Sequence, residues 1–151
     1  MHPITLVIAD REEGRRMACL RFLQSEKRMR VVAETRSGLD AIAATAKFKP
    51  SVLLLDGDLS LEMGASLIPA LRLKSPDSKV VLLVGRASEA PILDALSNGA
   101  RGYLEDKELS NFLTKAVQAV DAGEAWVTRQ MVAKIIAQLA RMPGPKNTWR
   151  T

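Results

Sequence analysis

The amino-acid sequence predicts a doubly wound α/β domain, in which helices cover both faces of one parallel β-sheet. Short apolar runs such as Leu6–Ala9 and Val52–Leu55 lack polar alternation, which is typical of strands buried on both faces. Strand and helix patterns alternate five times with short connections, and right-handed crossovers then leave few other topologies. With 151 residues, of which 47% are apolar, the chain is long enough for one domain with a full core.

The first two strand–helix units lie in the N-terminal third of the chain. A strand at Ile4–Ala9 precedes a helix at about Glu12–Ser25, in which three apolar side chains recur at helical spacing: Met17, Leu20 and Leu23. A short strand at Val31–Ala33 precedes the second helix, which begins after the N-cap Ser37 and ends at Lys47.

Three further units repeat this pattern. Their strands are expected at Val52–Leu55, Val80–Val84 and Gly102–Leu104. Their helices are expected at about Ala65–Leu73, Glu89–Leu96 and Leu109–Ala122. Proline and glycine mark the ends: Pro50 precedes the third strand, Asn98-Gly99 closes the fourth helix, and Gly123 ends the fifth. Pro69 fits the third helix only in its first turn or at a kink.

A sixth helix is expected over about Arg129–Arg141. Its apolar residues form a stripe at helical spacing: Met131, Val132, Ile135, Ile136 and Leu139. Such a stripe packs on its own domain or forms a partner surface, and the sequence leaves both readings open. We therefore divide the chain into a globular domain at residues 1–124, a linker helix at 125–142 and a flexible tail at 143–151.

Charge and cysteine content limit the function classes. Residues 1–124 contain 17 basic and 17 acidic side chains, so the net charge of +5 comes from residues 125–151. The globular part therefore lacks the basic bias of a nucleic-acid-binding domain. Cys19, the only cysteine, is expected to be buried, and no internal disulfide can form. No apolar stretch approaches the roughly 18 residues of a membrane span, so we expect a cytoplasmic location and no membrane partner.

Two acids end strands of the expected sheet. Asp10 follows Leu6–Ala9, and Asp56 follows Val52–Leu55. Because open α/β sheets bind ligands at the carboxyl ends of their strands, both carboxylates are expected at the ligand crevice. Two such acids can hold a hard cation, and one of them can accept a phosphoryl group.

The chain resembles the receiver domain of bacterial two-component response regulators, in particular the LuxR/NarL-type branch. The similarity covers about Ile4–Leu139 and depends on the order and spacing of several stretches: Ile8–Asp10, Val32–Glu34, Lys49–Asp56, Ser75–Val80, Asn98–Leu104 and Ala122–Trp126. The resemblance implies a flavodoxin-like sheet of five parallel strands in the order 2-1-3-4-5. Five flanking helices and an extra C-terminal helix complete that fold.

The resemblance also implies roles for single residues. Asp56 matches the aspartate that accepts a phosphoryl group from a histidine kinase. Asp10 matches the first of two acids that hold Mg²⁺, and Tyr103 matches the aromatic residue whose rotation accompanies activation. The second acid position is Arg11 here, which weakens the expected Mg²⁺ binding by charge repulsion.

Two more positions depart from the family pattern. Val84 stands where the family has a hydroxyl, and Asp106 stands where it has a lysine. The transferred phosphoryl group would therefore lose both contacts. The residues after the acceptor, Leu59-Ser60, also replace the usual Met-Pro.

Several arrangements of this site remain open from the sequence. Arg11 could place its guanidinium in the metal position and pair with Asp10 or Asp56. Alternatively, Asp58 or Glu12 could supply a replacement oxygen, so that Asp10, Asp56 and Asp58 would form a weak metal pocket. Arg11 could also point to solvent and leave Asp56 without chemistry.

Three functions follow from these readings. The first is an atypical receiver, with no enzymatic activity beyond self-phosphorylation or dephosphorylation at Asp56, that regulates transcription through an output domain or partner. The second is an ordinary phosphoacceptor that a histidine kinase activates at Asp56. The third is a flavodoxin-like cofactor binder, although no Gly-rich phosphate loop follows the first strand and His2 is the only histidine. We expect a homodimer through the face formed by the fourth helix, fifth strand and fifth helix, or through the sixth helix. DNA contact is expected only through an output domain outside these residues.

Overall fold

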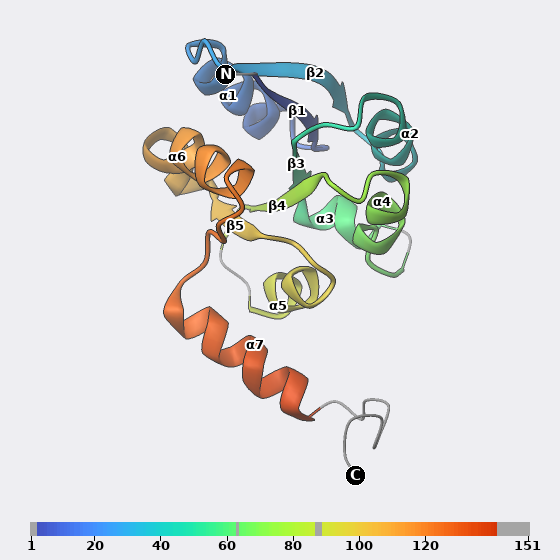
Figure 1. The fold of residues 1–151 in the computed structure, drawn as a ribbon, viewed down its shortest axis with the longest axis vertical. Coiled ribbons are helices and arrows are strands. Elements are labelled where there is room, and N and C mark those ends of the chain that lie inside the picture. The colour runs from blue at the N-terminus through green and yellow to red at the C-terminus, as the bar shows by residue number, and fades with distance from the viewer. Residues whose placement is uncertain (1–2, 63, 87–88, 142–151) are drawn as a thin grey trace.

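The computed structural model describes residues 3–62, 64–86 and 89–141. Its centre is a sheet of five parallel strands in the order β2-β1-β3-β4-β5, which confirms the predicted fold (Figure 1). The strands are β1 Ile4–Ala9, β2 Met29–Thr35, β3 Val52–Asp56, β4 Lys79–Val84 and β5 Gly102–Glu105. The helices are α1 Glu13–Gln24, α2 Gly38–Phe48, α3 Gly57–Ser60, α4 Ile68–Lys74, α5 Glu89–Ser97, α6 Leu109–Asp121 and α7 Arg129–Arg141. A 3₁₀ turn, η1 at Asp106–Glu108, joins β5 to α6.

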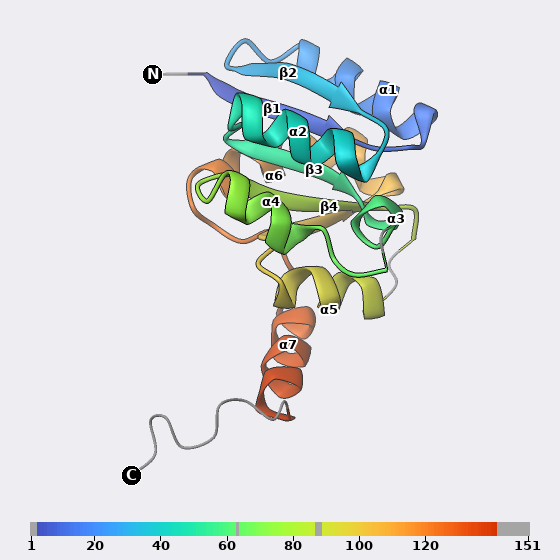
Figure 2. The same ribbon diagram turned by 90° about the vertical axis from the view of Figure 1, so that its right-hand side faces the viewer.

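Helices cover the two faces of the sheet in separate layers. Helices α1 and α6 lie on one face, and α2, α4 and α5 lie on the other (Figures 1 and 2). The central strand β3 is buried along its whole length and serves both layers, because alternate side chains point to opposite faces. Leu53 and Leu55 pack with α2, α4 and α5, whereas Val52 and Leu54 pack with α1 and α6. The unalternated apolar run in the sequence therefore has the physical cause that was predicted for it.

Three elements differ from their expected bounds. The edge strand β2 extends to Met29–Thr35 because it pairs along β1, beyond the short apolar run in its middle. The single turn α3 at Gly57–Ser60 was not expected, since four residues carry too little periodicity to be recognised. The next helix, α4, begins at Ile68, later than expected, and this places Pro69 in its first turn.

The segment before α7 extends the sheet by one residue. Trp126 forms a parallel bridge with Gly102 of the edge strand β5. The Trp126 N–H donates to the carbonyl of Arg101 (2.9 Å), and the Tyr103 N–H donates to the carbonyl of Trp126 (3.2 Å). This pairing covers part of an otherwise open sheet edge and fixes where α7 begins.

Helix α7 lies beside α5 and extends away from the sheet (Figures 1 and 2). Its apolar residues divide between two faces. Met131 and Ile135 pack against the core that contains α5, while three others are exposed: Val132, Ile136 and Leu139. One face of the stripe therefore packs on its own domain, and the partner surface stays a prediction for the exposed face. The predicted division of the chain at residues 124 and 142 stays a prediction, and the tail at 143–151 lies outside the described residues.

Within the described residues, no helix is both long and apolar enough to cross a membrane. Cys19 is buried, as predicted. Burial raises the pKa of its thiol to about 12, so the thiol stays protonated at neutral pH.

Candidate functional site

Acidic residues from three parts of the chain converge at the carboxyl edge of the sheet. Asp10 follows β1 and is fully buried, and Asp56 ends β3 and is 3% exposed. Asp106 begins the turn after β5, and its side chain is 43% exposed. The structure therefore brings Asp10 and Asp56 together as the sequence predicts.

A single guanidinium, from Arg15, lies among these acids. Its Nε donates to Oδ2 of Asp10 at 2.6 Å, and its Nη2 donates to Oδ1 of Asp10 at 3.1 Å. The same Nη2 donates to Oδ1 of Asp56 at 2.9 Å, and Nη1 donates to Oδ1 of Asp106 at 3.2 Å. The Arg15 side chain is only 6% exposed. This is a two-pronged contact with Asp10 that also bridges to Asp56, a geometry for which arginine is well suited.

The start of α1 explains how Arg15 reaches the site. The Asp10 Oδ1 accepts the N–H of Glu12 at 2.9 Å, which turns the chain directly after β1. Helix α1 then begins at Glu13, so Arg15 lies in its first turn. Because side chains on a helix lean toward its N-terminus, the arginine extends back over the end of β1.

Both carboxylate oxygens of Asp56 already accept hydrogen bonds. Oδ1 accepts from Arg15 Nη2 and from the N–H of Asp58 (3.0 Å), and Oδ2 accepts from the N–H of Arg11 (3.2 Å). Burial raises the pKa of Asp56, and the charge of Asp10 raises it further. The two backbone N–H groups and Arg15 lower it, but the net direction is upward.

The pKa of Arg15 moves upward as well. Burial alone lowers the pKa of this guanidinium, but hydrogen bonds to Asp10 and Asp106 and the charges of Asp10 and Asp56 raise it overall. Several carboxylates thus stabilise the charged form of Arg15, whereas Asp56 and Asp10 share one guanidinium. The pocket therefore contains more negative than positive charge.

The hypothesis that Arg11 supplies the guanidinium is wrong. The Arg11 side chain is exposed, and its contact with Asp56 is made by the backbone N–H. Arg16, which follows Arg15 in α1, is also buried, but it donates to the carbonyl of Asp10 (3.0 Å) and pairs with Glu34 (3.4 Å). A guanidinium does lie between Asp10 and Asp56, but it belongs to Arg15, which the sequence did not single out.

The other predicted site residues lie around this cluster. The Asp58 side chain is exposed, and its contact with Asp56 is made by the backbone N–H. Glu12 approaches Arg15 at 3.5 Å. Val84 ends β4 and is 8% exposed, and it offers no polar group to the site. Asp106 reaches the site by its contact with Arg15.

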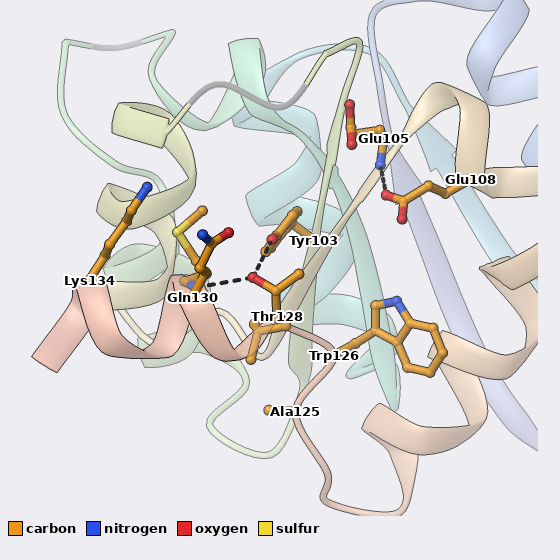
Figure 3. Close-up of a pocket in the computed structure, with 10 residues that line it drawn as sticks. Tyr103, Glu105, Glu108, Ala125, Trp126, Thr128, Gln130 and Lys134 are labelled. Carbon is orange, nitrogen blue, oxygen red and sulfur yellow. Dashed lines mark hydrogen bonds between the residues drawn. The ribbon is translucent and has the colours of Figure 1, made fainter.

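Tyr103 lies on β5, next to a groove of about 490 Å³ between β5 and α7. Figure 3 shows its hydroxyl directed toward Thr128, and the two oxygens lie 3.5 Å apart. Thr128 also accepts the N–H of Met131 at 3.1 Å, in the first turn of α7. The predicted switch aromatic is therefore joined to the start of α7.

The family model of the response regulator receiver domain matches residues 6–118. The chain belongs to this family. Among the relatives of this chain, the transcriptional regulatory protein DegU of Brevibacillus brevis is 29% identical over 92% of this chain and 59% of its own length. The oxygen regulatory protein NreC of Staphylococcus aureus is 30% identical over 87% of this chain and 61% of its own length. The chain thus spans about 60% of the length of these relatives.

Solved structures of receiver domains have the same fold. The receiver of the response regulator NarL from Mycobacterium tuberculosis superposes with a TM-score of 0.74 and 24% identity, over 82% of this chain and 100% of that one. The isolated receiver of RcsB from Salmonella enterica serovar Typhimurium gives a TM-score of 0.74 and 18% identity, over 89% of this chain and 99% of that one.

Receiver domains generally bind Mg²⁺ at their acidic site, but the residues present here do not fit the ion as arranged. Mg²⁺ requires near-octahedral oxygen ligands at about 2.0–2.1 Å. Three of the four carboxylate oxygens of Asp10 and Asp56 face Arg15, at 2.6, 3.1 and 2.9 Å. Across the described residues, no group of three or more His, Cys, Asp or Glu side chains is arranged to hold a metal ion.

Proposed function

We propose that this chain is an atypical receiver domain, whose signalling state is set without Mg²⁺-dependent phosphorylation of Asp56. The observation that carries the proposal is the buried ion pair between Arg15 and Asp56, with nitrogen and oxygen 2.9 Å apart. A phosphoryl acceptor attacks the incoming phosphorus with a lone pair of a carboxylate oxygen, and each hydrogen bond to that oxygen makes it less nucleophilic. Here Oδ1 accepts from Arg15 and Asp58, and Oδ2 accepts from Arg11.

The surroundings of Asp56 also disfavour a phosphorylated product. Val84 brings a methyl group where a hydroxyl would hold a phosphoryl oxygen, and its backbone is paired with Glu105 of β5. Asp106 adds a negative charge that already uses part of Arg15. A phosphoryl group, which carries about two negative charges, would enter a pocket with excess negative charge.

Transcription regulation is the process that the relatives support. DegU is named a transcriptional regulatory protein, and both it and NreC are longer than this chain. We propose that this receiver acts in the same kind of process through an output domain or a partner. A histidine kinase remains the candidate upstream partner.

The contact surface of the proposed homodimer is α7. One of the two expected faces, formed by α5, β5 and α6, is partly covered because α7 packs on α5. The outer face of α7 instead exposes Val132, Ile136 and Leu139, spaced by four and three residues. This spacing is typical of a seam between paired helices.

Phosphorylation of the purified chain tests the proposal. The protein is incubated with millimolar Mg²⁺ and acetyl phosphate, and intact mass is measured beside an Asp56→Asn control. We expect no adduct on either protein. A stoichiometric adduct on the wild type that is absent from Asp56→Asn would reject the proposal.

The alternative is an ordinary phosphoacceptor receiver. It is favoured by the survival of Asp10 and Asp56 as buried neighbours at the strand ends. Transfer from a histidine kinase that fails with Asp56→Asn would establish it. The receiver family match accounts for the same topology and so disfavours the flavodoxin-like cofactor binder.

A further inference from the structure

We propose that Arg15 is the resident cation of this receiver: its guanidinium takes the charge-balancing position of a divalent ion and closes the pocket to Mg²⁺. The inference rests on the proposed function and adds a residue that supplies its physical cause. Arg15 thus has the role that the sequence suggested for Arg11, a guanidinium in the metal position.

The position of one atom carries the inference. Arg15 Nη2 lies 3.1 Å from Oδ1 of Asp10 and 2.9 Å from Oδ1 of Asp56, and so bridges the two buried carboxylates. An ion that binds both acids must coordinate at least one oxygen of Asp10, and both of these oxygens already accept from Arg15, Oδ1 from Nη2. Because Nη2 is already there, the arginine and the ion exclude each other by volume as well as by charge.

The burial of the pocket explains why it needs a cation at all times. The side chains of Asp10 and Asp56 are 0% and 4% exposed, and buried charges are costly unless they are paired. A metal ion can leave, whereas Arg15 is covalently attached and its helix begins only three residues after Asp10. The pocket is therefore neutralised in part whether or not divalent ions are present.

Neighbouring arginines in α1 and its leading loop do not compete for this role. Arg11 is exposed and reaches Asp56 by its backbone alone. Arg16 is turned toward Glu34, on β2. Arg11 therefore provides a matched control: it carries the same charge and lies one residue from Asp10, but its side chain is exposed.

Divalent-ion binding by three proteins tests the inference. Wild type, Arg15→Met and Arg11→Met are titrated with MnCl₂ and MgCl₂ while thermal unfolding is recorded, with EDTA as the metal-free reference. We expect no metal-dependent shift of Tm for wild type or Arg11→Met. Arg15→Met should bind Mn²⁺ about tenfold or more tightly than wild type, because a positive charge next to the ion is removed.

Two further measurements keep the test decisive. Adding Asp10→Asn to Arg15→Met should abolish the gain, which shows that the ion uses the pocket. Where Arg15→Met does not fold in EDTA, recovery of its far-UV circular dichroism in MnCl₂ measures the same binding. The inference is overturned if wild type binds Mg²⁺ at millimolar concentration, if Arg15→Met gains no affinity, or if Arg11→Met gains as much.

Failure of this inference differs from failure of the proposed function. An Asp56-dependent adduct on wild type at millimolar Mg²⁺, with no metal-dependent shift of its Tm, would reject the proposed function and leave the role of Arg15 intact. A metal-dependent Tm shift of wild type without any adduct would reject the role of Arg15 and leave the proposed function intact.

Discussion

Replacing Arg15 with methionine removes the cation of the pocket while keeping much of the side-chain volume. At a separation of about 4 Å and an effective dielectric of about 20, each buried pair of charges has a gross attraction of about 4 kcal/mol. Arg15 has two such buried partners, Asp10 and Asp56. The cost of burying the guanidinium offsets part of this sum. Breaking a buried pair by removing one partner costs roughly 3–5 kcal/mol, and we expect Arg15→Met to fall in that range.

The size of this loss should depend on pH. Arg15 lowers the pKa of Asp56, so without it burial and the charge of Asp10 raise the pKa of Asp56 in the folded variant still further above the unfolded value. Such a group costs stability above its folded pKa, and the cost disappears as the pH falls through that value. The gap between variant and wild type should therefore narrow as the pH falls from 7 toward 4.

Urea unfolding followed by far-UV circular dichroism measures these differences. Arg11→Met serves as the control, because its side chain is exposed and such changes usually stay within about 0.5 kcal/mol. An Arg15→Met variant within 1 kcal/mol of wild type at pH 7 would refute the reasoning. A gap that widens at lower pH would refute the charge assignment.

Three further predictions follow from other contacts. Asp56→Asn should unfold at a higher urea concentration than wild type at pH 7. Burial raises the pKa of Asp56, so its charged form destabilises the folded wild type above that pKa. The stability difference between Asp56→Asn and wild type should shrink as the pH falls toward the ordinary aspartate pKa of about 3.9. A variant less stable than wild type across this range would contradict it. Gly102→Ala should lose about 1–3 kcal/mol, since its Cβ would meet the Trp126 carbonyl oxygen at 2.6 Å, and hydrogen exchange at residues 126–128 should accelerate; unchanged exchange there would show that the bridge does not hold α7. Ile136→Glu should abolish concentration-dependent association in sedimentation velocity. Leu73→Glu is the control, because Leu73 is 82% exposed but lies outside α7, and it should not change association. A wild type that stays monomeric at high concentration would refute the proposal that α7 forms the dimer contact.

The fold was predictable from the sequence because its strands are buried on both faces. Val52–Leu55 and Val80–Val84 are unbroken apolar runs that few other arrangements would bury. The element bounds that were missed lie where tertiary contacts decide the structure. The edge strand β2 gains its outer residues by pairing with β1, and the single turn α3 is held by the end of β3.

The two buried acids of the site could be predicted from the sequence, but the arginine that pairs with them could not. Asp10 and Asp56 are marked by their positions at strand ends, which bring them together in any sheet of this order. Arg15 carries no such mark, since it is one of several basic residues near the start of α1. The available signal was its place in the first turn of the helix, from which a long side chain leans back over the strand end. Arg11 follows the acid directly, but its side chain is exposed.

A crystal structure grown in millimolar MgCl₂ tests the central claim most directly. The account predicts the Arg15 guanidinium between Asp10 and Asp56, with Nη2 within hydrogen-bond distance of both and no metal density beside them. A six-coordinate Mg²⁺ bridging the two aspartates, with Arg15 turned to solvent, would contradict it.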